Sequence, residues 1–279
     1  MRTIRHIHTA TDAHWVGNGF PVSTMFSYFE NPQAVSPFLL LDYAGPVQFG
    51  PAQRARGVDS HPHKGFETVT LVYHGEVAHR DSTGQGGVIG PGDVQWMTAG
   101  SGILHEEFHS DAFAKSGGTL EMVQLWVNLP AEHKATPANY QSLEAATMPF
   151  HQFDALESSY RVVAGTFNGV TGPARIMSDL LVMDLNLVAG ESIELPFPKH
   201  WNLMMTTLTG TVLVNQSEIV RDASLVSFAN HGDSIHLEAN NDSRLLVTAG
   251  APLNEPVVGY GPFVMNTEEE IAQAIKDFA

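Results

Sequence analysis

The chain has 279 residues, of which 43% are hydrophobic and 16% are charged, and this balance excludes a wholly disordered protein. Its formal net charge of −16 at pH 7 disfavours direct binding to the phosphate backbone of nucleic acids. It contains no cysteine, so disulfides, thiolate zinc sites and cysteine nucleophiles are excluded, and any bound metal must have nitrogen and oxygen ligands.

The N-terminal residues 1–6 lead into polar residues rather than into a long apolar run. No stretch of the chain approaches the roughly 20 apolar residues that a membrane span requires. We therefore expect no signal peptide, no contact with a membrane and a cytoplasmic location.

Signals for β-strands dominate the chain. Residues 38–43 predict a short buried strand, and Gly45 with Pro46 is expected to end it. Further strands are predicted by runs of β-branched and aromatic residues at 67–73, 94–97 and 121–129. The segment 131–155 is more polar and is expected to be a linker on the surface, after which the β pattern resumes.

One amphipathic helix is predicted at the end of the chain. Thr267 and Glu270 have the spacing of a capping box, in which each side chain satisfies a backbone N–H at the start of a helix. Apolar residues then follow at helical spacing at 271, 274, 275 and 278. We expect this helix to pack on a sheet and to have no catalytic role.

Two short pairs of residues are the best candidates for metal ligands. In a strand, residues i and i+2 face the same way, so His61 can point with His63, and His105 can point with Glu107. If the two strands face each other inside a barrel, they supply three imidazoles and one carboxylate. Such a set suits a first-row transition metal better than Ca²⁺ or Mg²⁺.

Two alternatives compete with this ligand set. His105, Glu106 and His109 match H-E-x-x-H, the zinc protease motif in which Glu106 would be the base and His109 a ligand. That motif requires a helix, and the glycines before it predict none. Glu67 is a second candidate carboxylate, because a bulge at Gly65 could bring it toward the site.

The remaining polar candidates are given ordinary roles. We expect surface or partly buried positions without ligand function for six further histidines, His6, His8, His14, His74, His79 and His109. Gln124 shares a strand face with Met122 and Trp126, and it is expected to line the cavity because a buried amide needs a partner. Met122 and Trp126 are interpreted as plain core residues.

The two halves of the chain also show a weak internal repeat. Residues 94–100 align with 226–232 at an offset of 132, and residues 75–77 align with 210–212 at an offset of 135. The candidate ligands then fall on Pro196, Pro198, Leu237 and Ala239, none of which can bind a metal. We therefore predict a duplicated β barrel or jelly roll.

The motifs together resemble the pirin family. The segments that carry the resemblance cover residues 61–69, 91–100, 102–105, 124–129 and 261–267. It implies an all-β bicupin, with a metal-binding cupin domain at 1–130, a linker at 131–155, and a second cupin domain without metal ligands at 156–279 that ends in the helix. The family's ligand pattern falls on His61, His63, His105 and Glu107, and the family metal is iron(II), although Ni, Cu, Zn, Mn and Co accept the same ligands.

The resemblance implies two functions for the site. In the first, the protein is a quercetin 2,3-dioxygenase that opens a flavonol-like aromatic substrate with O₂, and Glu107 removes the proton of the flavonol 3-hydroxyl. In the alternative, the protein is a non-enzymatic iron or redox sensor that regulates through protein partners.

Overall fold

The computed structural model describes residues 1–279 and contains two compact units. We call the first the histidine unit, because it contains the predicted ligands; it comprises residues 12–27, 38–145 and 253–279. We call the second the apolar unit, after its barrel interior; it comprises residues 1–11, 28–37 and 146–252. No helix in the structure is both long enough and apolar enough to cross a bilayer.

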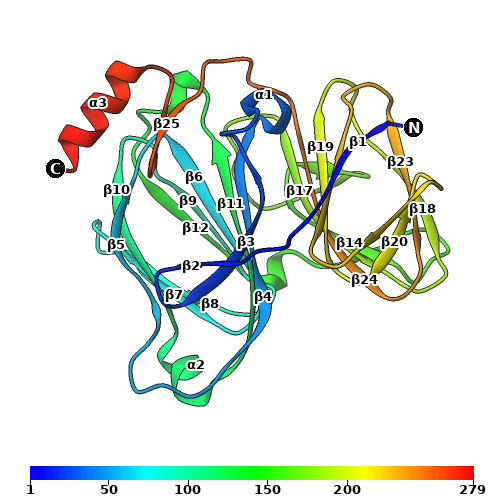
Figure 1. Ribbon diagram of the computed structural model, residues 1–279, viewed down its shortest axis with the longest axis horizontal. Helices are drawn as coiled ribbons and strands as arrows, with labels where there is room; N and C mark the ends of the chain where they lie inside the picture. The colour runs from blue at the N-terminus through cyan, green and yellow to red at the C-terminus, as the bar shows by residue number, and fades with distance from the viewer. The chain divides into compact units, whose positions relative to one another are not determined.

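The histidine unit consists of a seven-stranded and a four-stranded antiparallel sheet (Figure 1). The order in the larger sheet is β12 (Asn139–Leu143), β9 (Val94–Thr98), β6 (Phe66–His74), β11 (Gly118–Asn128), β4 (Phe38–Phe49), β3 (Phe20–Ser27) and β2 (His14–Val16). The order in the smaller sheet is β5 (Gly57–His63), β10 (Ile103–His109), β7 (Val77–Asp81) and β8 (Gly86–Ile89). A short helix, α2 (Asp111–Ser116), lies between β10 and β11.

The apolar unit has the same architecture. The order in its larger sheet is β1 (Ile4–Thr9), β22 (Ser224–Phe228), β19 (Asn202–Thr209), β24 (Ser243–Gly250), β17 (Leu180–Leu187), β14 (Ser159–Ala164) and β13 (His151–Gln152). The order in its smaller sheet is β18 (Ser192–Pro196), β23 (Ser234–Ala239), β20 (Thr211–Val214) and β21 (Glu218–Arg221). Its short elements are α1 (Pro32–Val35), β15 (Thr166–Phe167) and β16 (Val170–Thr171), whereas η1 (Ala131–His133) belongs to the histidine unit and η2 (Ala145–Thr147) begins at the last residue of that unit's segment 38–145. The expected all-β fold with two barrel-like units is confirmed.

The shared topology corrects one step of the sequence repeat. In the histidine unit His61 pairs with His105, whereas in the apolar unit Ile193 pairs with Leu237. The equivalents of His61 and His63 are therefore Ile193 and Leu195, at the same offset of 132, and not Pro196 and Pro198. The prediction was wrong here because it aligned this strand from the turn at residues 75–77. The segment between strand and turn differs in length between the two halves of the chain. Ile193, Leu195, Leu237 and Ala239 all belong to the buried core of the apolar unit.

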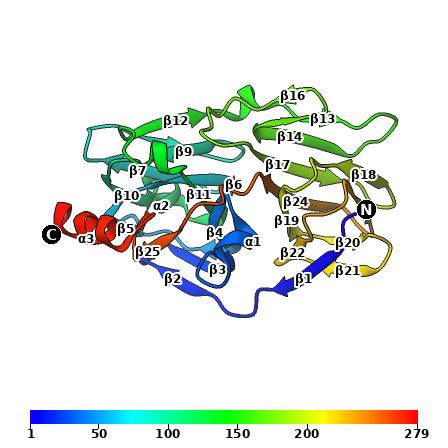
Figure 2. The ribbon, with the colours of Figure 1, turned by 90° about the horizontal axis from the view of Figure 1, so that it is seen from above.

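The compact units do not coincide with the boundaries predicted at 1–130, 131–155 and 156–279. Strand β1 pairs with β22 and so belongs to the apolar unit, as the blue and yellow strands in Figure 2 show. The C-terminal helix α3 (Glu268–Asp277) belongs instead to the histidine unit. The predicted linker contains strand β12, which pairs with β9 and extends the larger sheet of the histidine unit. Buried Gln141 and Leu143 fix β12 to this sheet.

Strand β4 is longer than predicted, because Gly45 and Pro46 lie within it. The pairing of β4 with β11 shifts register next to these residues. A proline can be accommodated at such an irregularity because no ladder hydrogen bond from its nitrogen is needed. A Cβ at Gly45 would lie 2.5 Å from the carbonyl oxygen of Leu120, so the close approach of the strands requires glycine there.

The predicted C-terminal helix is present in the structure. Thr267 caps α3 with the full capping box to Glu270, and Ile271 and Ala274 face inward. The helix packs on the hairpin of β25 (Val258–Tyr260) and β26 (Phe263–Met265). Lys134 fixes this hairpin to the barrel through its buried Nζ, which donates to the carbonyl oxygens of Gly65 and Val264 at 2.7 and 2.9 Å.

Candidate metal centre

Three histidines come together on the paired strands β5 and β10. The register places His61 opposite His105 and His63 opposite Ile103. Alternation along β10 buries the odd-numbered residues 103 to 109 and leaves Leu104 exposed, so His105 points into the barrel. One ring nitrogen from each of His61, His63 and His105 lies within 4.8 Å of the others, an arrangement that could hold a metal ion.

The three imidazoles are suited to act as neutral ligands. Burial, and secondarily the neighbouring His61, lower the pKa of His63 to about 3, and burial also holds the pKa of His105 well below its usual value. His61 has its Nδ1 2.9 Å from the carbonyl oxygen of Asp59, which leaves Nε2 as the free nitrogen. The Nδ1 of His63 and both ring nitrogens of His105 are buried without a hydrogen-bond partner. Buried polar atoms of this kind usually have a partner, and a metal ion with nitrogen ligands fits the set.

Glu107 lies on the same face of β10, although its carboxylate is not part of the three-histidine group. It lines the cavity beside His61 and His63. Its Oε1 lies 3.4 Å from the hydroxyl oxygen of Thr70. The same hydroxyl is closer to Gln124 and donates a hydrogen bond of 2.9 Å to its Oε1. Burial raises the pKa of Glu107 to about 7, against a smaller lowering by Thr70.

A cavity of about 220 Å³ opens in front of these ligands. Gln124 lines it, as does Trp126, whose ring lies 5.5 Å from that of His63 between centroids. Met122 belongs to the buried core as predicted, but the interpretation of Met122 and Trp126 as core residues only was incomplete, because both also contribute to the cavity wall. The rest of the wall is mainly apolar and comprises Val16, Phe20, Val22, Val58 and Pro262.

Asp42 is a cavity residue that sequence reasoning missed. It lies on β4 directly opposite Gln124, which itself lies opposite Thr70 on β6. Its Oδ1 accepts a hydrogen bond of 2.6 Å from Thr24, and the carboxylate lines the cavity while 8% exposed. The signal was present, since a carboxylate in the middle of the apolar stretch 38–43 is unusual and needs a reason.

The side chains of the two competing ligand assignments are engaged elsewhere in the fold. Residues 105–109 form a strand, so the helix that the zinc protease motif requires is not formed. His109 Nε2 lies 2.9 Å from the carbonyl oxygen of Gly19, and the ring packs against three phenylalanines, whereas Glu106 pairs with Arg80 on the other face. Glu67 alternates away from Thr70, and its carboxylate accepts a hydrogen bond of 2.7 Å from Thr98.

His79 was wrongly expected to be an ordinary surface or partly buried residue. It is 6% exposed and lies opposite Glu107 on the neighbouring strand β7. Its ring stacks on that of Tyr140 with 5.1 Å between centroids, and its Nδ1 is buried without a partner. Burial lowers the pKa of His79 to about 4, against a smaller raising effect of Asp81.

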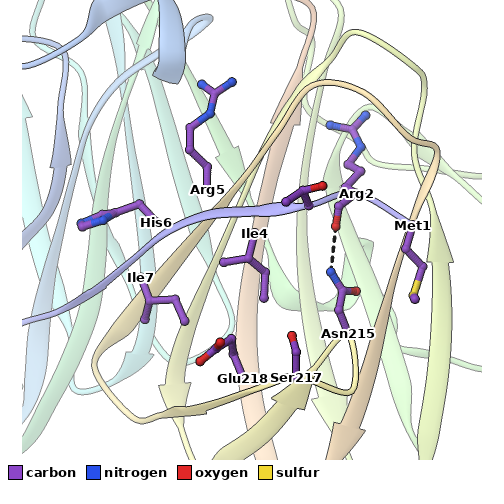
Figure 3. A pocket seen from close by; sticks show the side chains of 10 residues that line it. Met1, Arg2, Ile4, Arg5, His6, Ile7, Asn215, Ser217 and Glu218 are labelled. Atoms are coloured by element: carbon purple, nitrogen blue, oxygen red, sulfur yellow. Dashed lines mark hydrogen bonds between the residues drawn. The ribbon is translucent and has the colours of Figure 1, made fainter.

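A larger groove, of about 640 Å³, lies in the apolar unit between the N-terminal strand and the turn after β20 (Figure 3). Asn215 donates a hydrogen bond of 2.8 Å to the carbonyl oxygen of Arg2 across it. The charged side chains of Arg5 and Glu218 are exposed and point in different directions. This groove is open to solvent and holds no convergent set of ligands, so the histidine cavity is the better candidate site.

Comparison with known proteins agrees with this fold. The chain matches the pirin family over residues 19–127 and the pirin C-terminal cupin domain over residues 182–279. It is 54% identical over 278 residues to a Pseudomonas aeruginosa protein named "Putative quercetin 2,3-dioxygenase", covering 100% of this chain and 97% of that one. Human pirin is 36% identical over 250 residues, covering 88% of this chain and 81% of that one.

A crystal structure of quercetin 2,3-dioxygenase from Acinetobacter baumannii superposes with a TM-score of 0.97 at 49% identity, and the match covers 100% of this chain and 96% of that one. Both halves of the chain thus match the same family, and the agreement extends from sequence to fold. The chain belongs to the pirin family of bicupins.

Proposed function

We propose that this protein is a metal-dependent dioxygenase that opens the central ring of a flavonol, as a quercetin 2,3-dioxygenase does. The observation that carries the proposal is the group of three neutral imidazoles at an apolar cavity, with the Glu107 carboxylate on its wall. The names of the Pseudomonas and Acinetobacter relatives support the same activity.

His61, His63 and His105 would hold the metal ion, and Glu107 would complete the ligand set from the next inward position of β10. Iron(II) is the proposed metal, and Ni, Cu, Zn, Mn and Co share its preference for these ligands. When bound, such an ion supplies Lewis acidity toward a flavonol oxygen and makes O₂ chemistry accessible.

The protein's own residues then have distinct tasks. Glu107 accepts the proton of the flavonol 3-hydroxyl, because its carboxylate lies on the cavity wall beside the histidines. The hydroxyl of Thr70 lies between Glu107 and Gln124 and donates its one proton to the closer oxygen, that of Gln124. The apolar wall excludes water and accepts flat rings, so the flavonolate is held for a reaction that consumes O₂ and releases carbon monoxide with the opened ester.

The proposal is tested with purified, iron-loaded protein and quercetin under air. We expect loss of the flavonol absorbance with release of carbon monoxide, and no such activity in His63→Ala. Glu107→Gln should retain the shape of the site and lose about 10²-fold or more in kcat, the usual contribution of a positioned base. His231→Ala, which changes an exposed histidine, should behave like wild type.

Turnover by wild-type protein no greater than that of His63→Ala would refute the enzymatic proposal. The regulatory alternative would then be tested by asking whether a protein partner binds differently to the Fe²⁺ and Fe³⁺ forms.

A further inference from the structure

The cavity has polar groups in two places, separated along its larger sheet. Glu107 and the histidines lie at one side, and Asp42 lies on β4, two strands across from Thr70. Adjacent strands are about 4.8 Å apart, so this step corresponds to roughly 10 Å. Gln124, on the strand between them, accepts a hydrogen bond from Thr70 on the metal side.

The carboxylate of Asp42 has unused hydrogen-bonding capacity. A carboxylate can accept about four hydrogen bonds, and Thr24 donates one of 2.6 Å to its Oδ1. Burial raises the pKa of Asp42, against smaller lowering effects of Thr24 and His14, so a further hydrogen-bond donor would stabilise its charged form. Thr24 and Gln124 flank it, while the neighbouring cavity wall at Val22 and Met122 is apolar.

The size of the cavity indicates how a ligand would reach Asp42. At about 220 Å³ it is smaller than the roughly 300 Å³ or more of pockets that enclose drug-sized ligands. It therefore accommodates one end of a flat, multi-ring molecule. A ring that enters with one oxygen at the histidines would direct substituents on its far edge toward β4.

We propose that Asp42 is the specificity-determining residue of this cavity, and that it accepts a hydrogen bond from a ring hydroxyl of an aromatic ligand whose other oxygen lies at the histidines. Gln124 assists from the adjacent strand. The inference deepens the proposed function and rests on it for the choice of flavonols as ligands. It predicts a preference for polyhydroxylated rings over bare ones, because a site built to bind a hydroxyl discriminates against a ligand that lacks it.

The test compares quercetin with 3-hydroxyflavone, which keeps the 3-hydroxyl and lacks the other ring hydroxyls. Binding is measured anaerobically by flavonol fluorescence on metal-loaded protein, and kcat and KM are measured separately under air. We expect Asp42→Asn to weaken quercetin binding and raise its KM about tenfold, and to leave 3-hydroxyflavone nearly unchanged. Gln124→Leu should show the same selectivity with a smaller loss.

Controls separate this effect from loss of charge or fold. Asp154→Asn removes one negative charge from an exposed position in the apolar unit and should match wild type. Metal content and melting temperature are measured for every variant.

The outcomes distinguish the two proposals. Quercetin binding that depends on Asp42 without turnover would support the role of Asp42 and refute the dioxygenase. Turnover with equal effects of Asp42→Asn on both flavonols, or with none, would refute the role of Asp42 and leave the dioxygenase standing. Binding of neither flavonol by wild-type protein would overturn both.

Discussion

His79 illustrates what burial does to a single titratable side chain. It lies inside the barrel between Tyr140 and the strand of the proposed ligands, with a pKa lowered to about 4. In the unfolded chain the same imidazole titrates near 6.5. Between these two values the unfolded state therefore binds one more proton than the folded state, and acidification favours unfolding.

Because of His79, we expect the free energy of unfolding of metal-free protein to fall by up to about 3 kcal/mol as the pH falls from 7 to 4. His79→Gln should lack this pH-dependent part of the unfolding free energy. The difference in unfolding free energy between wild type and variant should therefore change between pH 7 and pH 4 and stay constant above pH 7. Urea unfolding at several pH values measures it.

His231→Gln is the matched control, because it replaces an exposed histidine. An unchanged pH dependence in His79→Gln, or an equal change in His231→Gln, would contradict the assignment of the effect to burial.

The residues of the site differ in how far sequence could predict them. His61, His63, His105 and Glu107 follow from alternation, which is a local property of a strand. The contact between Thr70 and Glu107, like the place of Asp42, depends on which strands are neighbours and in what register. That information is not local. The sequence could therefore suggest Gln124 as a cavity residue but could not identify its neighbours Thr70 and Asp42.

At the scale of elements, Lys134 holds the β25–β26 hairpin in place. Its Nζ donates to Gly65, Val264 and the Asn128 side chain, and it is 3% exposed. Burial lowers the pKa of Lys134 to about 8, against smaller raising effects of Glu255 and Glu270. The hairpin matters to the site because Pro262, between β25 and β26, lines the cavity.

Lys134→Met should retain most of the side-chain volume and leave three buried acceptors without their donor. We expect a loss of roughly 3 kcal/mol or more in unfolding free energy, since each unsatisfied buried group costs about 1–3 kcal/mol. Hydrogen exchange should also accelerate in residues 258–265. Lys115→Met, on the exposed face of α2, provides the comparison, and equal effects of the two changes would contradict the role of Lys134.

Elements with strong local signals were predictable, and those stabilised by distant partners were not. The capping box and apolar stripe predicted α3, and Thr267 caps it as expected. Strand β12 was expected to be linker, because its short polar sequence becomes a strand only through pairing with β9. The continuation of β4 through Gly45 and Pro46 likewise depends on the bulge against β11.

For the whole molecule, duplication explains both the predictable and the unpredictable parts of the fold. The two units repeat the same strand order in a seven-stranded and a four-stranded sheet. This repeat was visible in the sequence, because equivalent strands keep similar patterns. The exchange of the terminal segments was not visible in the sequence. Strand β1 joins the larger sheet of the apolar unit, and helix α3 belongs to the histidine unit.

The equivalent barrel interiors make a final prediction about metal and stability. Where the apolar unit has Ile193, Leu195 and Leu237, the histidine unit has three imidazoles. Buried ring nitrogens of His63 and His105 lack a hydrogen-bond partner, and they destabilise this unit unless a ligand binds. A metal ion at a free concentration of 100 times its dissociation constant would add about 2.7 kcal/mol to the free energy of unfolding. Chelation should therefore lower the melting temperature by roughly 5–10 °C for a unit of this size.

Hydrogen exchange locates the effect within the molecule. After chelation we expect faster exchange in β5 and β10, while the equivalent strands β18 and β23, whose interior is filled by apolar side chains, keep their rates. His105→Ala should show the chelated pattern whether or not metal is added, and its melting temperature should not respond to a chelator. A shift in wild type that His105→Ala reproduces in full, or equal acceleration in both pairs of strands, would mean that the stabilising ion binds elsewhere, because only β5 and β10 carry the three imidazoles.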